Sequence, residues 1–223
     1  MTPSLRHIGP SRHPLVVVDD FSGAVDDIVA IAAALAPFPP ATGYYPGLRH
    51  EIGSDDGAAN DYVTVTLEAA APFIGGAFGA EAFDLVGASF SMVTAAPSDL
   101  KLAQRMPHFD STDPGYLAVL HYLSDTPGTA FYRQRSTGID AVTDANRASF
   151  IAAATREGTG ARGYIAGSDA AFEQIGSVEG RRDRLVIYQG RLLHSGIIPA
   201  DGKLDADPRI GRLTANLFVQ ATR

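Results

Sequence analysis

Hydrophobic and polar positions follow different periods in the two halves of the chain. In the first half, the β-branched run at residues 15–18 predicts a short strand, and the apolar stretch 24–36 predicts a helix that Pro37 ends. Ser22 stands where an N-cap residue would begin this helix. Residues 62–71 begin with strand-like alternation and continue Ala-rich, and we interpret them as a helix.

From Phe83 onward the pattern changes to short alternating segments separated by Pro, Gly, Asp and Ser, which is typical of strands. Residues 146–156 and 168–175 look helical or loop-like, so an insertion near 137–182 interrupts the strands. The predicted strands are 83–94, 101–109, 116–123, 130–133, 184–189, 191–194 and 212–220.

A run of helices followed by about eight short strands predicts an α+β, mainly β fold. We expect a double-stranded β-helix core (a jelly roll, cupin-like), with N-terminal helices packed on it and the insertion in its middle. The length of 223 residues favours a single domain over 1–223. Within it, residues 1–82 would supply helical support and a lid loop, and residues 83–223 the core with its insertion.

Charge and composition limit which partners the chain can bind and which side chains can hold a metal. The chain has 18 Lys and Arg against 25 Asp and Glu, and a net charge of −7 disfavours nucleic acid as a partner. The longest apolar stretch, 28–38, is too short to cross a bilayer, so we expect no membrane partner and a cytoplasmic location. Because the chain has no Cys, any metal must be held by His and carboxylate side chains.

Three segments carry residues that could bind a metal ion or a ligand. In an extended segment His108 and Asp110 would point to the same side, while His194 ends a predicted strand 84 residues after Asp110. Arg212 and Thr214 share one face of the last strand. Taken singly, each has a structural alternative: a solvated strand end, a core histidine, or an arginine in an ordinary salt bridge.

Taken together, the order and spacing of these positions resemble the Fe(II)/2-oxoglutarate-dependent dioxygenase superfamily, nearest to its prolyl-hydroxylase-like branch. The resemblance covers roughly residues 84–220. It rests on the His-x-Asp motif, the distal His, the final Arg-x-Thr, and two intervening segments, Tyr-Leu-Ser at 122–124 and Gly-Thr-Ala-Phe-Tyr at 128–132.

The resemblance implies that His108, Asp110 and His194 bind Fe(II), and that Arg212 with Thr214 binds the far carboxylate of the cosubstrate 2-oxoglutarate. Three protein ligands leave open positions for 2-oxoglutarate and O₂. A guanidinium matches a carboxylate at two points. The retained carboxylate of this motif indicates hydroxylation or a related oxidation, because halogenating members of the superfamily replace it with a small residue.

The gap of 18 residues between His194 and Arg212 is longer than usual for the superfamily, and a longer hairpin loop over 199–208 would explain it. Arg209 competes with Arg212 for the carboxylate. Since it follows Pro208 and precedes Gly211, we expect Arg209 in the turn and Arg212 on the strand.

For substrate binding the candidates are Tyr44, Tyr45, Arg49 and Arg133. The first three lie in a Pro-Gly loop that could fold over the mouth of the site, although a plain surface turn explains that loop as well. The substrate would be a small molecule, an amino acid or a peptide side chain. The oligomeric state stays open, a homodimer being one option.

The resemblance implies an enzyme that hydroxylates an unactivated C–H bond and releases succinate and CO₂. Two other readings remain open from the residues. One is a jelly-roll binding module without activity. The other is a metal-dependent isomerase or hydrolase that uses the same His and Asp ligands.

Overall fold

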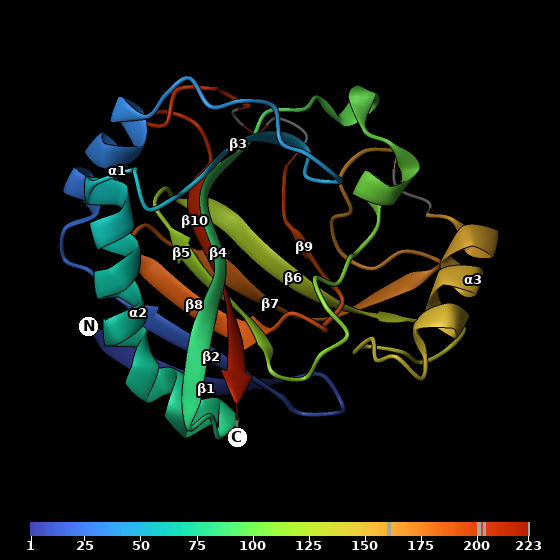
Figure 1. Cartoon of the computed structure of the whole chain (residues 1–223). Helices are drawn as coiled ribbons and strands as arrows, with labels where there is room; N and C mark the ends of the chain where they lie inside the picture. Colours follow the sequence, from blue (N-terminus) through green and yellow to red (C-terminus); the bar gives the residue numbers. More distant parts are fainter. Residues whose placement is uncertain (160–161, 200–201, 203, 223) are drawn as a thin grey trace.

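Two antiparallel β-sheets pack against each other in the computed structural model, which describes residues 1–159, 162–199, 202 and 204–222 (Figure 1). The large sheet has the strand order β1-β2-β8-β5-β10-β4-β3, and the small sheet has the order β7-β6-β9. The strands are β1 (Thr2–Ile8), β2 (His13–Asp19), β3 (Gly47–Glu51), β4 (Ala82–Val93), β5 (Tyr116–Tyr122), β6 (Thr126–Gln134), β7 (Phe172–Gly180), β8 (Arg184–Gln189), β9 (His194–Gly196) and β10 (Leu213–Thr222).

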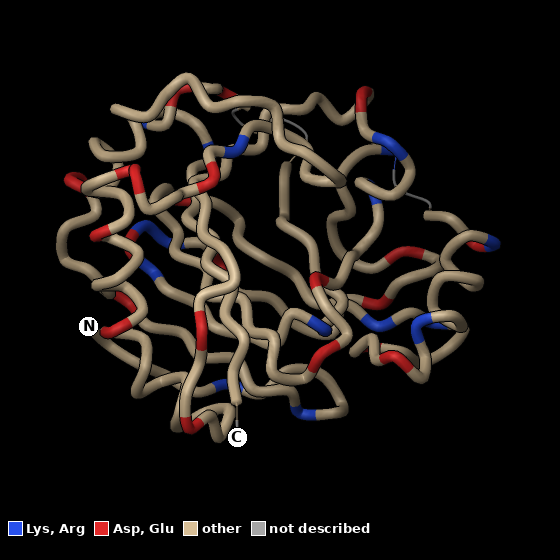
Figure 2. The backbone as a smooth tube through the Cα atoms, in the orientation of Figure 1, with Lys and Arg blue, Asp and Glu red and all other residues tan. Residues whose placement is uncertain are grey.

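Three helices cover the outer sides of these sheets. Helices α1 (Val25–Ala34) and α2 (Ala58–Phe78) lie on the outer face of the large sheet, and α3 (Arg147–Glu157) packs against the small sheet (Figure 1). Helices α1 and α2 carry acidic residues and no basic ones (Figure 2). Within the described residues, none of the helices has both the length and the apolar character needed to cross a membrane.

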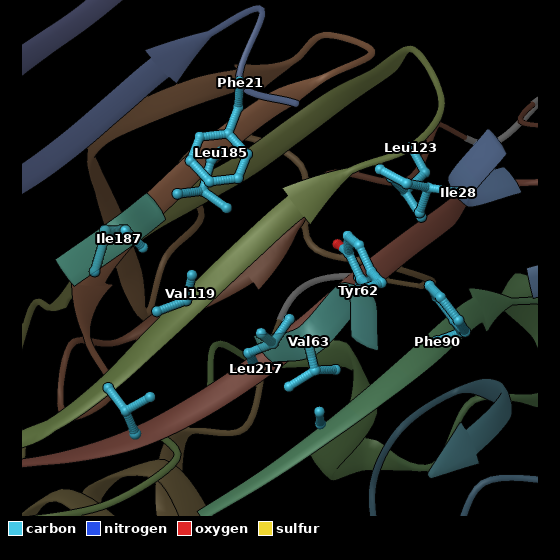
Figure 3. Packing of buried hydrophobic residues seen from close by; sticks show 14 of the residues in the cluster. Phe21, Ile28, Tyr62, Val63, Phe90, Val119, Leu123, Leu185, Ile187 and Leu217 are labelled. Carbon is cyan, nitrogen blue, oxygen red and sulfur yellow. The ribbon is translucent and has the colours of Figure 1, made fainter. Parts of the chain in front are cut away.

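Side chains that alternate along the strands point to opposite faces of the large sheet and pack into different clusters. On β10, Leu213, Ala215 and Leu217 are fully buried in the cluster that packs under α1 and α2. Figure 3 shows this cluster, in which α2 contributes Val63 and β4 contributes Phe90. Burying each large apolar side chain contributes about 1.5–3 kcal/mol, so this face contributes strongly to the stability of the sheet.

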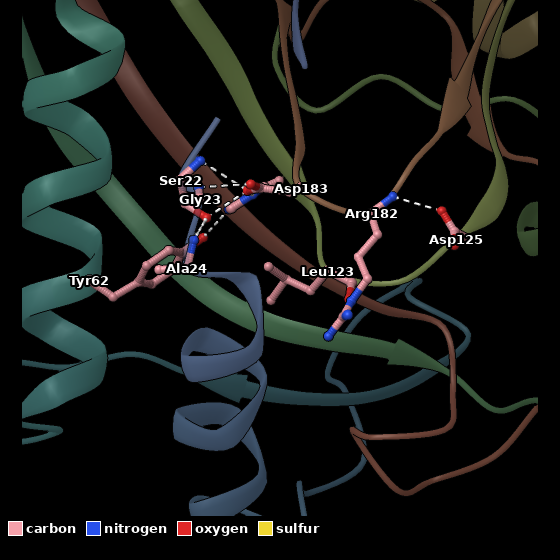
Figure 4. A network of polar contacts seen from close by, with 9 residues as sticks. Ser22, Gly23, Ala24, Tyr62, Leu123, Asp125, Arg182 and Asp183 are labelled. Carbon is pink, nitrogen blue, oxygen red and sulfur yellow. Dashed lines mark hydrogen bonds and ion pairs between the residues drawn. The ribbon is translucent and has the colours of Figure 1, made fainter. Parts of the chain in front are cut away.

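A polar network fixes where α1 and α2 meet the sheet. Asp183 has a φ of 63° and accepts hydrogen bonds from the backbone N–H and hydroxyl of Ser22 and from the backbone N–H of Gly23 (Figure 4). It also accepts one from Nε2 of the buried His121 at 3.0 Å, whose Nδ1 lies 2.9 Å from the Tyr62 hydroxyl. Burial raises the pKa of Asp183, but these hydrogen bonds outweigh burial and hold the pKa well below its ordinary value.

The predicted fold class is confirmed, and β8 has the predicted bounds. Ser22, by contrast, is not the N-cap of α1, because Ala24 takes that position and Ser22 is bound to Asp183. The predicted strand 101–109 is wrong. This segment holds a 3₁₀ turn at Leu102–Arg105, and its one bridge among the described residues joins His108 to His194 of β9.

Two further segments differ from the prediction. Residues 168–175 were expected to be helical or loop-like, but β7 begins at Phe172 and pairs with β6. Part of the expected insertion 137–182 is therefore a strand of the small sheet; residues 160 and 161 lie outside the described residues. Residues 47–51 were expected in a loop, yet they form β3, which pairs with β4 at the edge of the large sheet. The expected loop 199–208 is described only in part.

Candidate metal and cosubstrate site

Three metal-ligand side chains converge between the two sheets. His108, Asp110 and His194 each offer one ligand atom, and these atoms all lie within 4.8 Å of one another. The two histidines come together because their backbones exchange two hydrogen bonds, of 2.9 and 2.8 Å, which places the ring centroids 4.3 Å apart. The predicted partners, distant in sequence, are thus neighbours in space.

The turn after β8 brings Asp110 to the histidines. The backbone N–H of Asp110 donates a 2.7 Å hydrogen bond to the carbonyl of Gly190. A Cβ at residue 190 would lie 2.7 Å from the Tyr116 ring and 3.2 Å from the Asp110 Cβ, so only glycine allows this approach. The carboxylate oxygens of Asp110 then lie 3.7 Å from Nε2 of His108 and 3.6 Å from Nε2 of His194.

Both imidazoles are held in the form that binds metals. Burial lowers the pKa of His194 to about 4. The pKa of His108 is lowered in the same direction by the surrounding protein and by the neighbouring His194 ring, although 56% of the His108 side chain is exposed. Nδ1 of His194 lies 2.8 Å from the Leu192 carbonyl, so this nitrogen carries the proton and Nε2 keeps its lone pair. Two neutral imidazoles and one carboxylate on one side of a cavity are a donor set that fits Fe(II) with open positions.

A cavity of about 800 Å³ extends from this cluster along the inner face of the large sheet. Arg212 and Thr214 both line it. Nε of Arg212 is buried and makes no hydrogen bond within the described part of the chain. The buried hydroxyl of Tyr45, which also lines the cavity, lacks such a bond too. Buried polar atoms of this kind normally have a hydrogen-bond partner, which a ligand or a water molecule in the cavity would supply.

Arg209 lies elsewhere. Its side chain is 63% exposed, does not line the cavity, and sits 3.7 Å from Asp207 in the turn before β10. Arg212, by contrast, forms no ion pair with any carboxylate among the described residues.

The four candidates for substrate binding fall into two groups. Tyr44, Tyr45 and Arg49 line the cavity, and Tyr44 is 74% exposed at its mouth. Arg133 does not line it, because its guanidinium faces away and pairs with Glu173 at 2.6 Å. The structure therefore does not bring Arg133 together with the other three candidates.

The sequence analysis missed polar residues on β4. Ser89 and Ser91 are buried with their hydroxyls 3.3 Å apart, and Ser91 lies in register with Thr214 on β10 and with Arg49 on β3. The signal was present in the run Ala-Ser-Phe-Ser-Met, residues 88–92, where polar and apolar positions alternate within a buried strand. The inner face of the large sheet thus carries a polar row directly across three strands.

A sequence comparison with curated proteins finds no match. Among solved structures, the non-heme alpha ketoglutarate dependent epimerase SnoN from nogalamycin biosynthesis has a TM-score of 0.57 at 15% identity, covering 95% of this chain and 80% of that chain. AviO1 from Streptomyces viridochromogenes Tue57 has a TM-score of 0.54 at 15% identity, and the match covers 98% of this chain and 93% of AviO1. Iron-bound HygX from Streptomyces hygroscopicus has a TM-score of 0.51 at 14% identity, and the match covers 94% of this chain and 83% of HygX.

These similarities confirm, for the fold, the resemblance to Fe(II)/2-oxoglutarate-dependent oxygenases that the sequence predicts. A protein-family model described as "Family of unknown function (DUF6445)" matches residues 1–219. Because this match spans nearly the whole sequence, the chain belongs to the DUF6445 family.

Proposed function

We propose that this chain is a Fe(II)- and 2-oxoglutarate-dependent oxygenase that hydroxylates a small organic molecule, an amino acid or a peptide side chain. One observation carries the proposal: a cluster of two histidines and a carboxylate shares a cavity with an arginine whose buried Nε makes no hydrogen bond to any described residue. A structural neighbour supports the proposal, since SnoN has been crystallised in complex with Fe3+, alpha ketoglutarate and nogalamycin RO.

In this proposal His108, Asp110 and His194 hold the iron, and Arg212 with Thr214 holds the far carboxylate of 2-oxoglutarate. When bound, iron and 2-oxoglutarate would activate O₂, so that one of its oxygen atoms converts a C–H bond to an alcohol and the other enters succinate as 2-oxoglutarate loses CO₂. The chain's own residues position the reactants and exclude water. The Tyr45 hydroxyl, buried beside Thr214 and Ser91, supplies a further donor to the same carboxylate.

Metal binding and cosubstrate consumption test the proposal together. We expect the wild-type chain to bind one Fe(II) under anaerobic conditions and, once air is admitted, to form succinate from 2-oxoglutarate. His108→Ala, Asp110→Ala and His194→Ala should each abolish stoichiometric Fe(II) binding while keeping the circular dichroism spectrum. Arg133→Ala, which lies outside the cavity, is the matched control.

The outcomes separate the competing functions. Binding of Fe(II) without any consumption of 2-oxoglutarate would indicate a metal-dependent isomerase or hydrolase. A chain that binds neither would be a binding module. Full iron affinity in any one of the three ligand variants contradicts the assignment of that residue.

A further inference from the structure

Arg49 is a second cation in the cavity, and its side chain is held in place from three sides. Its Nε–H donates to the Ser91 hydroxyl at 3.1 Å, its guanidinium lies 4.5 Å from the centroid of the Tyr45 ring, and its NH1 is 3.8 Å from Glu51. The side chain is only 23% exposed and lines the cavity. An arginine fixed in this way keeps its remaining N–H donors ready for a ligand at little entropic cost.

The charge of Arg49 is not balanced inside the cavity. The charged side chains that line it within the described residues are Arg49, Asp110 and Arg212, besides the two histidines. Under the proposed function, Asp110 and the two carboxylates of 2-oxoglutarate neutralise Fe(II) and Arg212. Glu51 does not compensate, because it is 68% exposed, does not line the cavity, and forms only a long contact of the kind that solvent screens.

The remaining wall of the cavity is largely apolar. It includes Met106 and Phe109 from the segment before Asp110, and Phe150, Ile151 and Ala154 from α3. Ile151 is 45% exposed, which continues the apolar wall to the surface. A ligand that matches this cavity has an apolar body and one negative charge.

We propose that Arg49 binds the carboxylate of the substrate, and that the substrate is an apolar organic acid. This inference rests on the proposed function. A carboxylate fits better than a phosphate because it brings the single negative charge that remains to be matched, whereas a phosphate monoester carries about −1.5 to −2. Tyr45 and Ser91 act as positioning residues that hold the guanidinium toward the cavity.

Matched acids and amides test the inference on the anaerobic protein loaded with Fe(II) and 2-oxoglutarate. The probes are 3-phenylpropanoate with 3-phenylpropanamide, octanoate with octanamide, and phenyl phosphate, with affinities measured by calorimetry. We expect at least one acid to bind about tenfold or more tightly than its amide, which is the effect of losing one charged hydrogen bond. In Arg49→Ala and Arg49→Gln the preference for the acid should vanish, while Arg49→Lys should keep part of it.

Two controls separate this inference from the proposed function. Arg133→Ala should bind the probes as the wild type does, and the Arg49 variants should keep their affinity for 2-oxoglutarate. If no acid binds, if amides bind equally well, or if phenyl phosphate is preferred, the inference is overturned. The inference is also overturned if Arg49→Ala loses its affinity for 2-oxoglutarate, because Arg49 would then bind the cosubstrate. If the wild-type protein binds no 2-oxoglutarate at all, the proposed function itself fails.

Discussion

The two faces of the large sheet come from the same strands but have different surroundings: one packs under the helices, and part of the other lines the cavity. On β4, Phe90 points to the helices and is fully buried among apolar side chains, whereas the next residue, Ser91, points to the opposite face and accepts a hydrogen bond from Arg49. On β10, Leu213 and Thr214 divide in the same way. The comparison teaches that, at these positions of β4 and β10, one face packs under the helices and the other carries polar side chains, so substitutions of adjacent residues should have separable effects.

The largest effect on stability should come from the helix side. Phe90→Ala removes a ring that stacks on Tyr62 and Phe38 and leaves a cavity in the core, so we expect a loss of about 3–5 kcal/mol in the free energy of unfolding. Urea denaturation measures this loss. Ser91→Ala is the matched neighbour, and it should change the unfolding free energy by less than about 1 kcal/mol. Equal losses in both variants would contradict the division between the two faces.

A smaller, pH-dependent effect should come from the network at the helix ends. Because the folded-state pKa of Asp183 is depressed, its contribution is fully present above the unfolded-state pKa of about 4 and is lost as the pH falls below that value. At pH 7 we expect Asp183→Asn to cost about 1–3 kcal/mol, with Asn tolerating the positive φ. Denaturation curves from pH 7 to pH 3 should show the wild type and the variant converging. A difference that grows as the pH falls would refute this sign.

The smallest of these effects should come from the cavity side. Tyr45→Phe removes the buried hydroxyl that we propose as a donor to the cosubstrate carboxylate, and we expect the Kd for 2-oxoglutarate to rise about tenfold. Tyr44→Phe is the natural control, because Tyr44 is largely exposed, and its Kd should stay at the wild-type value. Calorimetric titration on the anaerobic iron complex measures both. If the two variants behave alike, Tyr45 is not part of the carboxylate site.

The sequence could predict elements whose periodicity decides their structure. The alternation over residues 212–220 predicted Arg212 and Thr214 on one face; both line the cavity, although β10 begins at Leu213, one residue after Arg212. The helical residues of α1 followed from apolar content and Pro37. The spacing of His108, Asp110 and His194 suggested a shared site through the family resemblance, since no local pattern links residues 84 apart.

Other features depend on pairing partners that periodicity does not reveal. Strand β3 consists of Gly, Leu, Arg, His and Glu, which is not a typical strand composition. It forms because Gly47 allows a close approach to β4, where a Cβ would lie 1.9 Å from the Met92 carbonyl oxygen. The position of Arg133 outside the cavity could not be predicted for a related reason: the side of the small sheet that it occupies depends on the register of β6 with β7.

The central claim is that Arg212, on the cavity face, binds 2-oxoglutarate next to a His108, Asp110 and His194 iron site. The most direct measurement is an anaerobic titration of 2-oxoglutarate into the Fe(II) complex, following the visible charge-transfer band that a chelating keto acid gives. Wild type and Arg209→Ala should titrate alike. Arg212→Ala should bind iron normally but raise the Kd for 2-oxoglutarate about a hundredfold or more, and Arg212→Lys less. Normal binding of 2-oxoglutarate by Arg212→Ala would contradict the account.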